Sequence, residues 1–240
     1  VPITITAEKL GLTPAETVDK FHSIIERDFR DFGISFSSFS RTTTKEHRDF
    51  AQSVFLELLR KGSIEPRLMK QLFCPSCERF LPDRYIGGTC PRCGSADARG
   101  DQCENCGVWI EPLELLEPRC SICGNSPEVR ETKHWFLLLD RFQGWISEWL
   151  ESRENWKDNV LNYCRGWLKD GLRERAITRD LDWGVPVPLP EARGKVLYVW
   201  FEALLGYISI TREYFREKGD PDGWERYWKD PDTRLVHFIG

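Results

Sequence analysis

The residues of this sequence that could do chemistry by type and spacing are its cysteines. Eight of the nine cysteines form four Cys-x-x-Cys pairs in one short stretch: Cys74 and Cys77, Cys90 and Cys93, Cys103 and Cys106, Cys120 and Cys123. One such turn can present two sulfurs to a tetrahedral zinc ion, and two turns complete a four-cysteine site. The spacing therefore predicts two zinc sites. Four thiolates leave no open position for water, so both ions are expected to be structural rather than catalytic.

The residue that follows each pair refines this prediction. Glycine comes directly after the second cysteine of three pairs, at Gly94, Gly107 and Gly124, whereas Glu78 follows the first pair. Glycine adopts positive φ without steric cost, which lets backbone N–H groups turn toward the thiolates. The first pair is accordingly expected to form the weakest of the four turns.

Two other uses of paired cysteines are disfavoured. A disulfide framework belongs to secreted proteins, and the start "VPITITAEKL" lacks the charged and apolar regions of a signal peptide. Redox chemistry needs one Cys-x-x-Cys motif rather than four. The spacing alone leaves open whether the pairs combine sequentially, crossed or nested. Cys164 stands by itself in a helical pattern and is expected to be a small buried residue.

The composition is that of a water-soluble globular protein, with 40% hydrophobic and 30% charged residues. No apolar run reaches the length of a membrane span, so no membrane partner and a cytoplasmic location are expected. The formal net charge of −4 argues against a zinc protein that simply binds DNA, because such proteins present a basic face.

The chain reads as α/β, then a cysteine-rich segment with helices, then α/β again. Helical spacing begins at the Thr13-Pro14 capping signal and runs to Gly33, and a second helix precedes Gly62. The alternation of "ISFSSFSRT" predicts a strand over 34–42. Regular periodicity is lost between about 73 and 133, as expected where metal replaces a core. Two helices are predicted over 136–174, a proline-rich loop over 177–190, a strand that enters a helix at "KVLYVWFEA", and a final strand at "RLVHFIG".

Several of these stretches, taken in order, resemble one family. "FLPDRYIGGTCPRCG", "GDQCENCG", "ERAITRDLDWGVPVP", "GKVLYVWFEA", "GYISI" and "VHFIG" are similar to the catalytic core of methionyl-tRNA synthetases, in the form with four knuckles. The resemblance implies an α/β fold: a Rossmann-like nucleotide-binding domain split by a zinc-knuckle connective-peptide insertion. It also implies the division 1–68 for part of the first catalytic half, 69–176 for the insertion with its helices, and 177–240 for part of the second half.

The same resemblance implies the function and its residues. The family is a class I aminoacyl-tRNA synthetase that activates L-methionine with ATP and Mg²⁺ and transfers it to tRNA(Met), with two structural Zn²⁺ ions. Arg179 matches a catalytic arginine, and Gly240 matches a glycine beside the adenosine. In family members that keep only two knuckles the outer two are lost together, which implies the nested pairing of the cysteines. The methionine pocket matches Trp200, Ala203 and Tyr207, with Leu204 in place of the family proline.

Two signatures of the class are not in this chain. In the family the HIGH-type motif lies upstream of the first residue matched here and the KMSKS-type motif downstream of the last, so residues 1–240 alone are expected to form no methionyl-adenylate. Two alternatives remain open. One is a zinc-ribbon-type binding module on an α/β scaffold without catalysis, and the other is a class I synthetase for another aliphatic amino acid.

The remaining polar residues are expected to be structural. His22, His47, His134 and His237 do not cluster along the sequence, and Asp180 is expected to orient a neighbour or cap a loop. Arg165, Lys169 and Arg173 fall on one face of a predicted helix. Such a stripe is usually a solvated surface, with contact to the tRNA acceptor end as the alternative.

Overall fold

The computed structural model describes residues 2–100, 102–108, 110–153 and 156–237, and its first part is helical. Helix α1 spans Pro2–Leu10, α2 spans Pro14–Asp31 and α3 spans Lys45–Arg60. The capping prediction for α2 is confirmed. Thr13 Oγ1 accepts a hydrogen bond from the Glu16 N–H, and the Glu16 carboxylate accepts one from the Thr13 N–H at 2.8 Å.

The segment over 34–42 is not the strand that its alternation predicts. Its aromatic side chains pack back onto α2 instead. The ring centroid of Phe29 lies 5.0 Å from that of Phe36 and 6.0 Å from that of Phe39. Residues three apart in a strand point to opposite faces, so two such residues cannot both reach one helical side chain from a regular strand. Contact with α2 therefore favours an irregular loop here.

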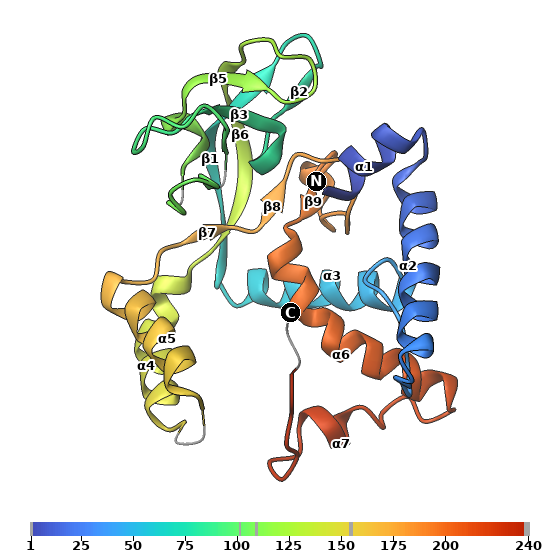
Figure 1. Cartoon of the computed structure of the whole chain (residues 1–240). Helices are drawn as coiled ribbons and strands as arrows, with labels where there is room; N and C mark the ends of the chain where they lie inside the picture. The colour runs from blue at the N-terminus through green and yellow to red at the C-terminus, as the bar shows by residue number, and fades with distance from the viewer. Residues whose placement is uncertain (1, 101, 109, 154–155, 238–240) are drawn as a thin grey trace.

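A long two-stranded ribbon rises from the level of α3 to the cysteine-rich part of the molecule (Figure 1). It consists of β1 (Ile64–Cys74) and β6 (Glu128–Leu137), which pair antiparallel from Ile64↔Leu137 to Phe73↔Glu128. These two strands are not among the elements predicted from the sequence. Short strands β2 (Arg79–Phe80) and β7 (Arg175–Ala176) complete a sheet of order β2-β1-β6-β7.

A second small sheet carries the knuckles. Its order is β4-β3-β5, with β3 at Ile86–Thr89, β4 at Ala98–Arg99 and β5 at Leu116–Cys120. Two 3₁₀ turns, η1 (Asp83–Tyr85) and η2 (Pro112–Glu114), lie in the loops. The core beneath this sheet contains four of the cysteines packed with a few large apolar side chains, among them Leu81, Tyr85, Ile86 and Ile110.

The two helices predicted over 136–174 are confirmed, with a later start because β6 continues to Leu137. After the 3₁₀ turn η3 (Leu139–Phe142), helix α4 spans Gln143–Glu151 and α5 spans Asp158–Asp170. The basic stripe needs correction. Gly171 ends α5 with φ of 81°, so Arg173 lies beyond the helix, while Arg165 and Lys169 are exposed on it.

The last part of the chain packs against α3. Strand β8 (Thr178–Arg179) pairs with β9 (Val196–Leu197), the turn η4 (Pro190–Ala192) lies between them, and α6 (Val199–Glu217) and α7 (Glu225–Trp228) follow. Their main core includes Ala51 and Phe55 of α3 with Trp135, Ile177 and Leu197. The predicted strand at "RLVHFIG" is absent from 234–237, and its last three residues lie outside the described part.

Every pairing between the strands named above is antiparallel. The expected mixture of helices and sheets, interrupted by a knuckle-bearing segment, is present. Within the described residues no helix combines the length and apolar character that a membrane crossing requires.

Candidate metal centres and candidate active site

The eight paired cysteines lie in two groups of four. The outer group is Cys74, Cys77, Cys120 and Cys123, and the inner group is Cys90, Cys93, Cys103 and Cys106. In each group the sulfur atoms all lie within 4.8 Å of one another. This is the nested arrangement, in which the first knuckle meets the fourth and the second meets the third.

The sulfur separations fit a zinc ion better than a disulfide. Cys74 Sγ lies 3.5 Å from Cys123 Sγ, and Cys93 Sγ lies 3.6 Å from Cys103 Sγ. A disulfide requires about 2.05 Å. Four sulfurs at about 2.3 Å from a tetrahedral ion lie about 3.8 Å apart. The donor set and its spacing therefore suit a closed tetrahedral site in each group.

The turns adopt the backbone conformation that the sequence predicts. Gly94, Gly107 and Gly124 have φ of 72°, 69° and 75°. Glu78 has φ of 49° at the corresponding place after the first pair. A non-glycine residue is strained in this region, which agrees with the prediction that this turn is the weakest.

In each group, a backbone N–H group lowers the pKa of one thiol below its usual value. The Ser95 N–H bonded to the Cys93 sulfur lowers the pKa of that thiol to about 6. The Asn125 N–H does the same for Cys123 and lowers its pKa to about 7. Cys77 shows the opposite shift, because its hydrogen bond to Cys123 raises its pKa to about 12. Zinc requires thiolates, so these N–H donors prepare the groups for metal.

The residues predicted to line a methionine pocket share one face of α6. Trp200, Leu204 and Tyr207 are 68%, 62% and 47% exposed, and Ala203 between them is half-buried. The Tyr207 ring packs edge-on against His237, with ring centroids 4.9 Å apart. The four residues are thus adjacent on an accessible surface.

Arg179, the last residue of β8, lies beside the start of the same helix. Its guanidinium is 3.8 Å from the ring centroid of Tyr198, the residue that precedes α6, and it donates to the backbone oxygens of Ala176 and Thr178. The cation is therefore fixed near the end of α6 where Trp200 lies. Gly240, the predicted nucleotide-binding residue, lies outside the described residues.

Two of the histidines are buried and fully hydrogen-bonded, as expected for structural residues. His47 of α3 bonds Glu202 at 2.6 Å and Ser209 at 2.9 Å, both on α6. His134 of β6 bonds Thr178 at 2.8 Å and Asp180 at 2.9 Å. Sequence reasoning did not single out Glu202 or Ser209, because the partners of His47 lie more than 150 positions away along the chain.

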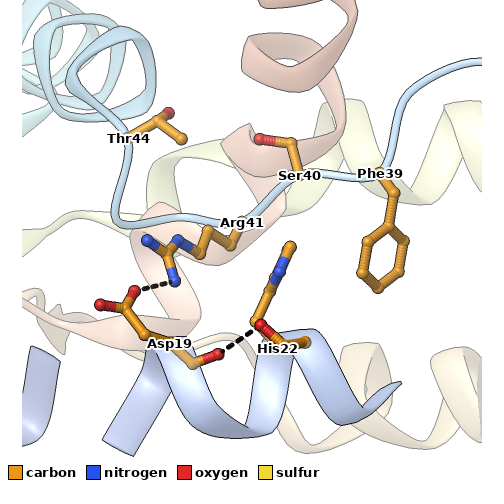
Figure 2. Close-up of a pocket in the computed structure, with 7 residues that line it drawn as sticks. Asp19, His22, Phe39, Ser40, Arg41 and Thr44 are labelled. Carbon is orange, nitrogen blue, oxygen red and sulfur yellow. Dashed lines mark hydrogen bonds and ion pairs between the residues drawn. The ribbon is translucent and has the colours of Figure 1, made fainter. Parts of the chain in front are cut away.

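A pocket of about 320 Å³ lies elsewhere, between α2 and the loop before α3 (Figure 2). Arg41 crosses it to pair with Asp19 at 2.6 Å, and the His22 ring lies 4.7 Å from the ring of Phe39. His22 Nε2 is buried and has no hydrogen-bond partner among the described residues. None of the residues predicted to carry the chemistry lines this pocket.

Comparison with known families decides the relationship. The family description "tRNA synthetases class I (M)" matches residues 1–240, the whole chain. The chain belongs to this family. The match extends through both segments that flank the cysteines, which disfavours an isolated zinc-ribbon module.

The relatives that match this chain over its whole length carry the name methionine–tRNA ligase. The methionine–tRNA ligase of Bacteroides fragilis is 49% identical over 241 residues, and that of Chlorobium luteolum is 52% identical over 243 residues. Each alignment covers 100% of this chain and 35% of the relative. The chain thus spans about a third of the length of these relatives.

A solved structure of the family supports the fold. The crystal structure of Mycobacterium tuberculosis methionyl-tRNA synthetase bound by methionyl-adenylate superimposes with a TM-score of 0.62 at 20% identity. The superposition covers 94% of this chain and 39% of that chain. The predicted fold class and the resemblance to the methionyl-tRNA synthetase family are therefore confirmed.

Proposed function

We propose that the protein containing this chain is a methionine–tRNA ligase. The observation that carries the proposal is the accessible face of α6, where Trp200, Ala203, Leu204 and Tyr207 lie together in a chain of this class I family. Aromatic rings beside an aliphatic side chain suit a thioether, which is apolar and polarisable. The relatives named methionine–tRNA ligases support the same assignment.

The proposed reaction joins methionine to AMP and then to tRNA(Met). The methionine carboxylate attacks the α-phosphate of ATP, the bond to the leaving group breaks, and methionyl-adenylate and pyrophosphate result. A hydroxyl at the tRNA 3′ end then attacks the acyl carbon and releases AMP. In the first step Arg179 offsets negative charge on the α-phosphate, and the α6 face orients the amino acid. Mg²⁺ accompanies ATP as part of the substrate.

We propose that both cysteine groups hold structural Zn²⁺. The close sulfur atoms and the N–H donors to Cys93 and Cys123 support this. When bound, the ions replace the apolar core that so small a sheet cannot build. They take no part in the reaction, because four thiolates leave no open position.

The division into 1–68, 69–176 and 177–240 is part of the proposal. The nested cysteine groups and the α4–α5 hairpin fall in the middle segment, as an insertion between two parts of one catalytic domain requires.

A cytoplasmic location is also part of the proposal. All nine cysteines lie within the described residues and have free thiols, which fits a reducing compartment. Proposed partners are L-methionine, ATP and tRNA(Met), without DNA or membrane.

Amino-acid-dependent exchange of pyrophosphate into ATP tests the function. A protein of the relatives' full length that contains this chain is assayed with each amino acid in turn. Methionine is expected to give the highest kcat/KM. A preference for another aliphatic amino acid would move the protein to a different class I specificity. No exchange with any amino acid would contradict the proposed enzyme altogether.

A further inference from the structure

A buried polar network joins the base of the β1–β6 ribbon to the strand that carries Arg179. Its centre is Asp180, the residue directly after Arg179. One carboxylate oxygen accepts hydrogen bonds from His134 Nε2 at 2.9 Å and from Thr132 Oγ1 at 3.0 Å. The other oxygen is paired with Lys195 Nζ, which also donates to Thr132 Oγ1 at 2.7 Å. Asp180 and Lys195 are each at least 85% buried as side chains.

The Asp180 carboxylate sets the directions of the hydrogen bonds at His134, because an ionised carboxylate can only accept. The nitrogen that faces it, Nε2, carries the proton and donates to Asp180. Nδ1 of the neutral ring then accepts from the Thr178 hydroxyl, whose oxygen in turn accepts from the Trp135 N–H at 3.2 Å. Burial lowers the pKa of His134, which keeps the ring neutral and fits this assignment. Each donor thus has a definite acceptor.

Strand β8 needs this support. It has only two residues, and its sheet partner β9 also has only two, in the register Thr178↔Leu197 and Arg179↔Val196. So short a pair is weak by itself. The network holds residues on both sides of Arg179, through the hydroxyl of Thr178 and the carboxylate of Asp180. Three different segments supply the other members: β6, the residue before β9, and β8 itself.

We propose that Asp180, held by His134 and Lys195, is a positioning residue that fixes Arg179 against Tyr198 at the start of α6. This rests on the proposed function, because Arg179 matters only if it acts on the α-phosphate. The network also fastens the root of the zinc-bearing ribbon to the reaction centre. Displacement of a preorganised cation slows the chemical step and leaves the amino-acid pocket intact.

The test is pyrophosphate exchange by Asp180→Asn in the full-length protein. The substitution keeps the size of the side chain and removes its charge. The kcat is expected to fall about 10- to 100-fold, while the KM for methionine changes less than about threefold. Asp182→Asn is the matched control, since this exposed carboxylate lies two residues along the same loop. It is expected to behave as the wild type.

A double-mutant cycle separates positioning from general structural damage. If Asp180 acts through Arg179, Asp180→Asn should cost less than about threefold in kcat when Arg179→Ala is already present. If the kcat loss of the double variant instead equals the product of the losses of the two single variants, the proposal is overturned. A wild-type protein without methionine-dependent exchange would contradict the proposed function instead, which is a distinguishable result.

Two further measurements keep the proposal testable if Asp180→Asn does not fold. Thr132→Val keeps the side-chain shape and removes one donor to Asp180, and it should show a smaller kcat loss with the same dependence on Arg179. Nitrogen-15 NMR of the wild type should find His134 neutral with its proton on Nε2. A proton on Nδ1, or a Thr132→Val loss that multiplies with that of Arg179→Ala, would overturn the network.

Discussion

At the scale of single residues, the two faces of α6 have opposite environments. Trp200, Leu204 and Tyr207 are exposed, whereas Glu202 and Ser209 on the other side are 7% and 2% exposed. A helix shows such a division when one side packs in a core and the other is left for binding. A substitution on the exposed face can therefore be tested for binding with little damage to the core.

The first prediction concerns Tyr207. Tyr207→Ala removes one wall of the proposed pocket and is expected to raise the KM for methionine about tenfold or more, since one good pocket contact is worth about 1–3 kcal/mol. Steady-state pyrophosphate exchange measures it. Tyr163→Ala is the control, because this tyrosine is 69% exposed on a different helix, α5. Equal increases in KM for methionine and ATP would contradict a pocket role.

The second prediction concerns the cysteines. The zinc-loaded protein is expected to contain two zinc ions per chain, and Cys120→Ser or Cys103→Ser is expected to lower this to about one. A thiolate is a much better zinc ligand than a serine hydroxyl, and three thiolates no longer close the site. Elemental analysis after dialysis against a weak chelator gives the ratio.

Cys164→Ser is the matched control for metal content, because this ninth cysteine lies on α5 outside both groups. It should keep two zinc ions. A loss of both ions from Cys103→Ser and from Cys120→Ser would show that the groups are not separate sites.

At the scale of helices and strands, α3 and α6 are joined by a buried polar contact. His47 of α3 is fully buried, and the Glu202 side chain that it bonds is only 9% exposed, so little water can reach its carboxylate. The contact lies on the opposite side of α6 from the exposed side chain of Leu204 and the half-buried Ala203. The position of the proposed pocket therefore depends on a histidine that does not line it.

The third prediction follows from this contact. His47→Ala leaves the Glu202 carboxylate buried without its partner, which is expected to lower the stability of the α3–α6 packing by about 3 kcal/mol. Because α6 then opens more often, amide hydrogen exchange in this helix should become about 100-fold faster. Mass spectrometry of peptides from 199–217 measures the change. His22→Ala is the control, since His22 bonds no group in the described residues through Nε2; similar exchange in the two variants would count against the prediction.

The helices could be predicted from sequence because their signals are local. The Thr13 and Glu16 capping pair, and the glycines at 33 and 62, lie within a few residues of the helix ends that they define. The β1–β6 ribbon could not be predicted in this way. Its pairs join residues such as Ile64 and Leu137, which are far apart in sequence and become neighbours only after the knuckles fold.

At the scale of the whole molecule, the candidate site also has one part that could be predicted from the sequence and one part that could not. The cysteine ligand sets and the α6 face follow from short motifs, together with the family that those motifs resemble. The partners of Asp180 do not. Thr132 and Lys195 lie 48 and 15 positions from it, and neither has a spacing that suggests a contact. Tertiary packing alone brings them together.

The fourth prediction is a pH dependence of stability. Burial lowers the pKa of His134 below its usual 6.5, so the unfolded chain takes up a proton there at a higher pH than the folded chain. Stability should therefore decline as pH falls below about 6.5, by at most about 1.4 kcal/mol per pH unit from this group. The charged groups that face the ring are Asp180, Lys195 and Arg179.

Asp180 adds a second, more acidic dependence. Burial alone would raise its pKa, but the hydrogen bonds from His134 and Lys195 together outweigh burial and lower the pKa below 3.8. The contribution of Asp180 to stability is present above pH 3.8 and is lost as pH falls through the folded-state pKa.

The experiment for the fourth prediction is thermal unfolding of the wild type and of His134→Gln from pH 7.5 to 5.5, at equal zinc. The difference between the two proteins isolates the contribution of the histidine. An identical pH slope in both proteins would contradict the assignment.

The nesting of the two cysteine groups has a consequence for the order in which the segment from Cys74 to Cys123 assembles. Cys93 and Cys103 are 10 positions apart, whereas Cys77 and Cys120 are 43 positions apart and enclose them. Closing the longer loop costs about 1.3 kcal/mol more in chain entropy, so otherwise equal groups would differ about tenfold in affinity. At substoichiometric zinc the inner group should fill first. Its closure shortens the free chain that the outer group must bring together, and by reciprocity the outer ion strengthens the inner one equally.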